Sequence, residues 1–159
     1  MKTNTPYIFE LTIKDSQVNN IIDLLENKNI NKFSFPLTGN QFKIYALTDK
    51  NNIIYVGSTK SSIKNRLRYG LKMNGQNGYH GYKWKKLPTV RLFVWCFEDY
   101  DREKVESVEA ELVFLIRTKT GKWPAHQNEI HFNNLFIPTG QQVAEKIYCQ
   151  ITDRLENNI

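Results

Sequence analysis

Two tyrosines, one arginine and one glutamate have the types and spacing that could act on a phosphate group. Tyr45 and Tyr55 lie in two strand-prone runs that flank a polar turn, so a hairpin would bring them close together. Arg66 lies on the helix expected next, at the edge of its apolar stripe, where its fork of N–H donors suits a phosphate. Glu109 falls inside the apolar stripe of a later helix, where a carboxylate is costly unless it is paired or binds a metal.

Each of these residues also has a purely structural explanation. Tyrosine is common in strands, and the Arg66 guanidinium could pack over Tyr69 or form a structural ion pair. Glu109 could be one partner of a buried ion pair. A single carboxylate with room for water, however, suits Mg²⁺, which keeps several of its waters when a protein binds it. The functional interpretation is therefore an arginine that meets a phosphate and a glutamate that binds a metal, and the structural alternatives stay open.

The elements that must position these residues predict a mixed α/β (α+β) fold, in which helices flank a small antiparallel sheet that contains the hairpin. Strands are expected at 7–13, 42–49, 53–58 and 89–97, with a short one at 129–132. Helices are expected at 16–28, 61–73, 101–120 and 139–156.

Basic residues are concentrated in the middle of the chain, which has a formal net charge of +6. No Asp or Glu occurs from Lys50 to Phe97, whereas ten Lys and Arg residues do. One sign of charge over so long a stretch attracts a polyanion. Nucleic acid is therefore favoured over a merely solvated basic surface.

Two groups of basic side chains are the candidate contacts to the phosphates of DNA. The first group is a row on one face of the helix at 61–73, formed by Lys64, Arg68 and Lys72. The second group follows a glycine-rich loop at 74–81 and consists of Lys83, Lys85 and Lys86. Trp84 lies among these lysines and suits stacking on a base. A solvated row and a mobile loop over a packed Trp84 are the alternatives.

The two cysteines, Cys96 and Cys149, are expected to be reduced core thiols in a cytoplasmic protein and not a disulfide or a metal site. No stretch approaches about 18 consecutive apolar residues, which excludes a transmembrane helix. The N-terminal segment lacks the apolar core and cleavage site of a signal peptide.

In this order, the residues resemble the motifs of the GIY-YIG nuclease family. Lys43-Ile44-Tyr45 resembles the first motif, and Tyr55-Val56-Gly57 resembles the second. Lys43 replaces a glycine, a change that could alter the approach to the site. Further along the chain, Arg66 matches the family's helix arginine, Glu109 its metal-binding glutamate and Asn128 the asparagine that follows a proline.

The resemblance covers residues 42–132, and the run 105–113 is similar to the corresponding helix of the excision-repair nuclease subunit. It implies a single domain over 1–159 with a nuclease core at 42–132. An N-terminal strand and helix would lie within 1–41, and a C-terminal helix within 133–159.

The activity that the resemblance implies is hydrolysis of phosphodiester bonds with one Mg²⁺ or Mn²⁺ ion. Glu109 would hold the metal, Arg66 would offset charge on the phosphoryl oxygens, and Tyr45 would orient or deprotonate the attacking water. A tyrosine that acts as a base needs a cationic neighbour, which Arg66, Lys43 or Lys64 could supply.

Two further residues have less definite parts in this scheme. Tyr55 would share the task of Tyr45 or bind the phosphate, and the sequence does not apportion the work between the two tyrosines. His80 is a candidate second base, with a plain loop histidine as the alternative.

A chain of this size resembles a free-standing restriction or defence nuclease of the family. The alternatives are a non-catalytic DNA-binding module on the same fold, a repair or homing nuclease, and an RNA-directed nuclease. The sequence leaves open the choice between DNA and RNA, and whether the chain acts alone or as a homodimer.

Overall fold

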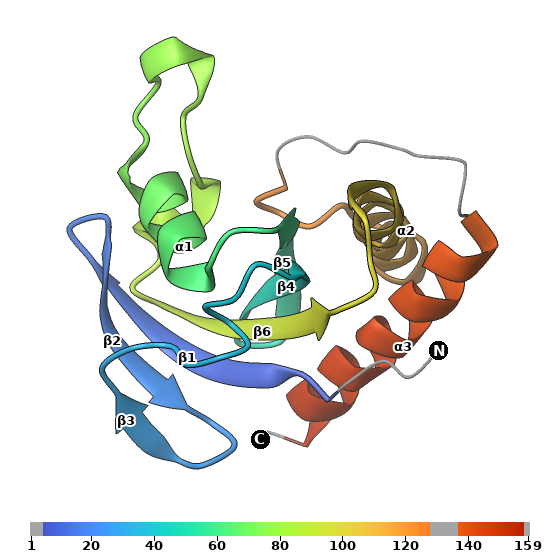
Figure 1. Cartoon of the computed structure of the whole chain (residues 1–159), viewed down its shortest axis with the longest axis horizontal. Coiled ribbons are helices and arrows are strands. Elements are labelled where there is room, and N and C mark those ends of the chain that lie inside the picture. The colour runs from blue at the N-terminus through green and yellow to red at the C-terminus, as the bar shows by residue number, and fades with distance from the viewer. Residues whose placement is uncertain (1–4, 128–136, 158–159) are drawn as a thin grey trace.

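The protein is built on one six-stranded antiparallel sheet with helices on both faces (Figure 1). The structure is a computed structural model, and it describes residues 5–127 and 137–157. The strands, in the spatial order β3-β2-β1-β6-β4-β5, are β1 (Tyr7–Lys14), β2 (Gln17–Asp23), β3 (Lys28–Ile30), β4 (Phe42–Asp49), β5 (Asn52–Thr59) and β6 (Thr89–Phe97). The helices are α1 (Ile63–Lys72), α2 (Arg102–Thr120) and α3 (Ile137–Glu156), with short 3₁₀ turns η1 (Gln76–Gly78) and η2 (Lys83–Lys86). This architecture confirms the expected α+β class.

The N-terminal part of the expectation is wrong, because the segment predicted as a helix at 16–28 forms strand β2 and the start of β3. Asp15 and Ser16 both have positive φ angles, of 51° and 56°, and make the tight turn that folds β2 back onto β1. Ile21 then pairs with Leu11 and lies in the core. The spacing of the apolar residues in 16–28 is compatible with one face of a helix. The β-branched residues among them favour a strand, and pairing with β1 decides in favour of the sheet.

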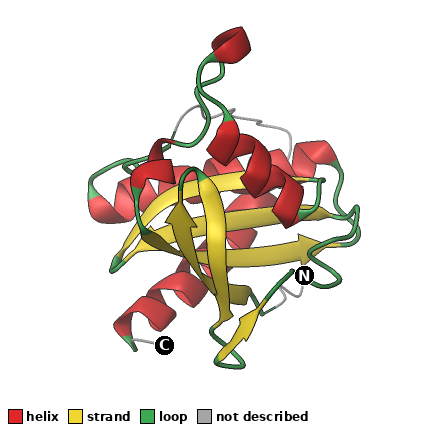
Figure 2. Ribbon diagram, turned by 90° about the vertical axis from the view of Figure 1, so that its left-hand side faces the viewer, coloured by secondary structure: helices red, strands yellow, loops and turns green. Residues whose placement is uncertain are grey.

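The sheet separates two cores, which Figure 2 shows as helices on either side of curved strands. One core lies under α1 and contains Tyr45, Leu47 and Tyr55. The other lies under α2 and α3 and contains Ile44 and Val56 of the same hairpin. Alternate residues of β4 and β5 therefore face opposite cores, and both faces of this hairpin are buried.

Helix ends follow the local signals of the sequence. The Ser62 side chain accepts a hydrogen bond from the backbone N–H of Asn65 at the start of α1, and Asp101 does the same for Lys104 at the start of α2. Gly121, with a φ of 76°, ends α2. The strand expected at 129–132 lies outside the described residues.

The two cysteines have different environments. Cys96 lies in the core under α1, and burial raises the pKa of its thiol to about 11. Cys149 is exposed on α3, so its assignment to the core is wrong. It lies between the inward-facing Ile147 and Ile151 along the helix and points outward. Among the described residues, the helices are too short or too polar to cross a bilayer.

Candidate active site

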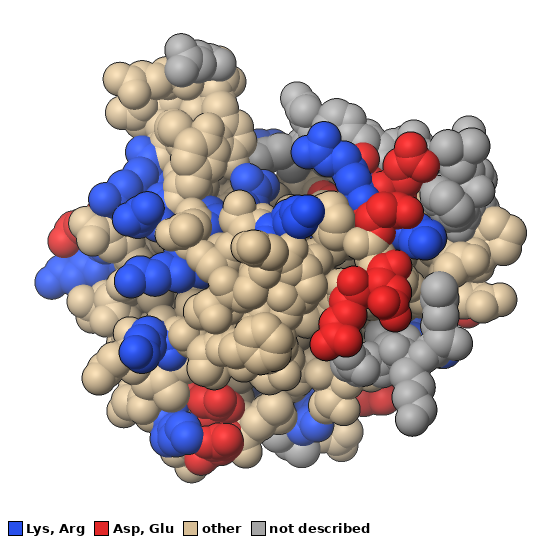
Figure 3. All heavy atoms as spheres, in the orientation of Figure 1, with Lys and Arg blue, Asp and Glu red and all other residues tan. Residues whose placement is uncertain are grey.

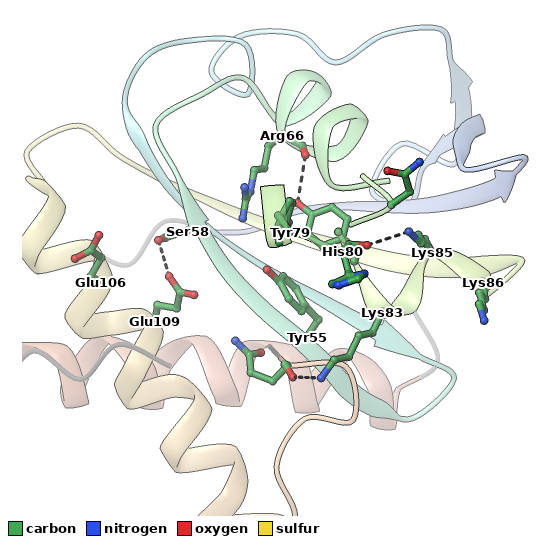
Figure 4. Close-up of a pocket in the computed structure, with 15 residues that line it drawn as sticks. Tyr55, Ser58, Arg66, Tyr79, His80, Lys83, Lys85, Lys86, Glu106 and Glu109 are labelled. Carbon is green, nitrogen blue, oxygen red and sulfur yellow. Dashed lines mark hydrogen bonds between the residues drawn. The ribbon is translucent and has the colours of Figure 1, made fainter. Parts of the chain in front are cut away.

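A pocket opens at the edge of the sheet, where β5 is the last strand. Tyr55 and Arg66 line it from the side of α1, and Ser58 lines it from β5 itself. Glu106 and Glu109 reach it from α2, which packs on the other face of the sheet. Figure 4 shows these carboxylates on one side of the pocket and the arginine on the other, with Tyr55 between them. The site thus spans the sheet edge and draws on elements from both cores.

Tyr45 and Arg66 are joined by a hydrogen bond at the back of this pocket. Tyr45 pairs with Gly57 across the hairpin, and its ring centroid lies 5.9 Å from that of Tyr55. Its side chain is fully buried, and its hydroxyl oxygen accepts a hydrogen bond of 3.0 Å from Nε of Arg66. Arg66 is therefore the cationic neighbour of Tyr45. The terminal nitrogens of its guanidinium are the groups that a phosphate in the pocket would meet.

Gly57 leaves room for both tyrosine rings. A Cβ at this position would lie 2.6 Å from Cζ and Oη of Tyr45 and 2.9 Å from Cε1 of Tyr55. Burial raises the pKa of both hydroxyls, although the nearby Arg66 lowers it again in part. Both residues are therefore neutral phenols at neutral pH, and of the two it is Tyr55 that lines the pocket.

Lys43, the departure from the family's first motif, does not alter the approach to the pocket. Its amino group is buried and donates hydrogen bonds to the carbonyl oxygens of Gly39 and Gln41, both at 2.8 Å, and of Ser61 at 3.3 Å. Burial lowers the pKa of this amine. Lys43 therefore ties the segment before β4 to the turn between β5 and α1, and the cation beside Tyr45 is Arg66.

Glu109 is half-buried at the pocket wall, where its Oε2 accepts a hydrogen bond of 2.5 Å from the Ser58 hydroxyl. Glu106 lies one turn earlier on α2 and forms an ion pair of 3.4 Å with Arg102. Within the described ranges, no three His, Cys, Asp or Glu side chains gather as a metal cluster. The donor set nevertheless fits a hard cation such as Mg²⁺, which takes one or two carboxylates and completes its shell with water and phosphate oxygens. Glu111, in contrast, lies beside Gly140 of α3.

Gln127 occupies the pocket wall next to the position where Asn128 was expected to act. Asn128 itself lies outside the described residues. The Gln127 side chain accepts a hydrogen bond of 3.0 Å from the Val56 N–H and donates one of 3.0 Å to the Val56 carbonyl. It therefore makes the two hydrogen bonds to the outer edge of β5 that a neighbouring strand would make. Lys83 donates to the Gln127 carbonyl at 3.2 Å and so also helps to hold this segment.

The arm between α1 and η2 projects from the body of the protein (Figure 1). Its residues Asn74 and Gly78 to Gly81 line one side of the pocket. Lys85 braces the base of this arm, because its amino group donates to the carbonyls of Met73 at 2.6 Å and His80 at 3.0 Å. The side chains of His80 and Lys86 are both exposed, and both line the pocket. Trp84 is fully buried, so the expectation that it stacks on a base is wrong.

The basic row of α1 lies beside a different groove. Lys64, Arg68 and Lys72 line a hollow between α1 and β2, whose floor includes Val18 and Leu67. Figure 3 shows basic side chains along this side of the molecule and acidic side chains gathered near the start of α2. The two expected groups of basic residues are therefore on different sides of α1.

Tyr82 is part of the site, although no motif in the sequence singles it out. It is fully buried, and its hydroxyl lies 3.0 Å from the hydroxyl of Tyr45. Its ring packs edge-on against Tyr55 and stacks on Trp84, with centroid distances of 5.4 and 4.6 Å. The signal available in the sequence was Gly70 in the middle of α1, since a glycine inside a helix often marks a close approach.

The comparisons with known proteins agree with this geometry. The model of the GIY-YIG catalytic domain matches residues 41–122, which is more than half of the chain. The chain therefore belongs to the GIY-YIG nuclease superfamily, and a nuclease-type function accompanies this domain. Nucleases of this superfamily generally depend on a divalent metal ion. Neither a curated protein nor a solved structure matches the chain.

Proposed function

We propose that this chain is a metal-dependent endonuclease that hydrolyses phosphodiester bonds of DNA, with a role in restriction or defence. The observation that carries the proposal is the convergence of Arg66, Tyr55 and Glu109 on one pocket from both sides of the β5 edge. A guanidinium, a phenol and a carboxylate at one opening can together stabilise charge on a phosphoryl group, orient a water molecule and hold a metal ion.

The position of each group suggests its part in the reaction. Arg66 offsets the charge that develops on the phosphoryl oxygens, while Tyr45 holds its guanidinium from behind through the 3.0 Å hydrogen bond to Nε. Tyr55, at the pocket wall, is the phenol placed to orient the attacking water or to bind the phosphate. A bound Mg²⁺ or Mn²⁺ would polarise the phosphate and stabilise the leaving oxygen. Glu109 would hold that ion, with its carboxylate oriented by Ser58.

Charge supports DNA as the substrate. The pocket wall carries Lys83 and Lys86, and the row of α1 presents exposed Lys64, Arg68 and Lys72 on its other side. Phosphate contacts on both sides of α1 would place this helix along the backbone of a duplex. His80, at the mouth of the same pocket, is a second proton acceptor within the scheme. We place the activity in the cytoplasm, where an exposed reduced thiol such as Cys149 persists.

The test is a cleavage assay on supercoiled plasmid, linear DNA and RNA, with Mg²⁺, Mn²⁺ or EDTA. We expect cutting of DNA that EDTA abolishes. Glu109→Gln should keep the fold and lose cleavage, because an amide does not replace an anionic metal ligand. Glu111→Gln, on the same helix beside α3, is the matched control and should cleave like the parent. Tight binding to DNA without cutting under any condition would favour the non-catalytic module, and cutting confined to RNA would reassign the substrate.

A further inference from the structure

Tyr82 is held against α1 by contacts that leave its ring little freedom. Its backbone N–H donates to the Gly70 carbonyl at 2.9 Å. A Cβ on Gly70 would lie 2.1 Å from Cε2 of the Tyr82 ring, so this ring occupies the space that a side chain on α1 would need. Gly81, with a φ of 74°, allows the chain to return this close to the helix. Gly70 follows Arg66 by four residues, so Tyr82 reaches the same helix face one turn later.

From this position Tyr82 contacts Arg66 at two places and Tyr45 at a third. Its hydroxyl donates to the Arg66 carbonyl at 3.3 Å, and the Arg66 guanidinium carbon lies 5.7 Å from the centre of its ring. The same hydroxyl lies 3.0 Å from that of Tyr45, which accepts from Nε of Arg66. Tyr45, Tyr82 and Arg66 are thus mutually connected, and the contacts surround the Arg66 guanidinium.

We propose that Tyr82 is a positioning residue that, together with Tyr45, forms a cradle for the Arg66 guanidinium and aims it at the scissile phosphate. The inference rests on the proposed nuclease function. A long arginine side chain has many rotamers, and fixing one of them beforehand removes an ordering cost from the reaction step. Tyr45 fixes Nε of the guanidinium, whereas Tyr82 supports its face and the backbone from which it extends.

Two substitutions at Tyr82 separate the contacts of the cradle. Tyr82→Phe removes the hydroxyl and keeps the ring in the notch at Gly70, whereas Tyr82→Leu removes the aromatic face as well. A general acid–base or charge-stabilising group is worth about 100- to 10,000-fold in rate, so a residue that only aims one should account for part of that. We expect single-turnover cleavage to slow about 10-fold or more in Tyr82→Phe, and further in Tyr82→Leu. DNA affinity measured in Ca²⁺ should stay within about twofold of the parent. Tyr148→Phe is the control, because Tyr148 lies on α3 and packs against the other core.

The decisive measurement is made in a chain that lacks the arginine. If Tyr82 acts through Arg66, then Tyr82→Phe should cost nothing further in the Arg66→Ala background. Millimolar guanidinium should partly restore cleavage to Arg66→Ala, because the cradle binds the added cation, and should fail to restore it to Arg66→Ala with Tyr82→Leu. If Tyr82 had a merely structural role, the losses of rate in the variant with both Arg66→Ala and Tyr82→Phe would be additive. Guanidinium would then restore cleavage to Arg66→Ala equally well with and without the Tyr82 ring.

The outcomes distinguish the two proposals. A parent chain that cleaves while Tyr82→Phe and Tyr82→Leu match it overturns the cradle alone. Additive losses, or equal rescue by guanidinium with and without the Tyr82 ring, also overturn it. A parent chain that cuts no nucleic acid overturns the proposed function and the cradle with it. Circular dichroism and thermal unfolding of each variant exclude loss of the fold as the reason for a slow rate.

Discussion

Replacing Gly57 by alanine tests the site without removing any reactive group. The new Cβ would lie 2.6 Å from Oη of Tyr45, whereas ordinary contact starts at 3.4 Å, so the tyrosines must retreat by roughly 1 Å. Overpacking of this kind costs about 1–3 kcal/mol of unfolding free energy. For a chain of 159 residues, we expect the melting temperature to fall by roughly 2–12 °C. Because Tyr45 holds Nε of Arg66, a displacement of this size should also slow cleavage by about 100-fold.

The assay pairs thermal unfolding with single-turnover cleavage in Mg²⁺ well below the melting temperature. Gly121→Ala is the control, since Gly121 ends α2 with a φ of 76° and a Cβ there meets nothing within 4 Å. That variant should lose about 1 kcal/mol through backbone strain and keep the rate of the parent. Equal rates in Gly57→Ala and Gly121→Ala would refute the reasoning, because the tyrosines would then tolerate displacement without effect on the chemistry.

Three further outcomes follow from the contacts described. Arg68→Ala should lower the slope of log DNA affinity against log salt concentration by about one unit, with little change in the maximal cleavage rate. Arg66→Ala should reduce the cleavage rate far more than the DNA affinity, and the reverse result would exchange the roles of the two arginines. Lys85→Ala should loosen the arm, seen as faster amide exchange and proteolysis at 73–81, with a salt slope like that of the parent if this lysine contacts carbonyls and not phosphate. In urea, stability should fall as the pH rises above about 9, because the pKa of Cys96 is raised from 9.0 to about 11 and the pKa values of the three buried site tyrosines lie above 10.0. Because the pKa of each group is higher in the folded than in the unfolded state, its contribution to stability is complete below the unfolded pKa. That contribution is lost as the pH rises, by about 1.4 kcal/mol per pH unit for each group. A free energy of unfolding that stays constant up to about pH 11 would contradict the burial of these groups.

Elements with strong local signals could be predicted from the sequence. The hairpin, α1, β6 and α2 have clear turns, caps and periodicity, and these patterns place Arg66 on α1 and Glu109 on α2, the two residues that meet at the pocket. The segment at 16–28 was predicted wrongly because its apolar spacing suits a helix, while the choice of sheet depends on pairing with β1.

The parts of the site that were missed depend on contacts between distant segments. Tyr82 meets Tyr45 across 37 positions of the chain, and Gln127 meets Val56 across 71. Neither residue belongs to a local motif, so its place becomes visible only when the arm and the segment after α2 have folded onto the sheet. Trp84 is the opposite case, because its local sequence suggests a function that its position excludes. A tryptophan among lysines suggests an exposed ring that stacks on a base, whereas Trp84 is buried and stacks on the ring of Tyr82.

The pairing of Gln127 with Val56 has a consequence for association between copies of the chain. An edge strand with open N–H and carbonyl groups is a template on which a strand of another molecule can add. The Gln127 amide satisfies one N–H and one carbonyl of β5 in the way such a strand would, and it does so beside the pocket. The same side chain that shapes the pocket wall therefore also occupies two of the backbone groups with which a strand of a second molecule would pair.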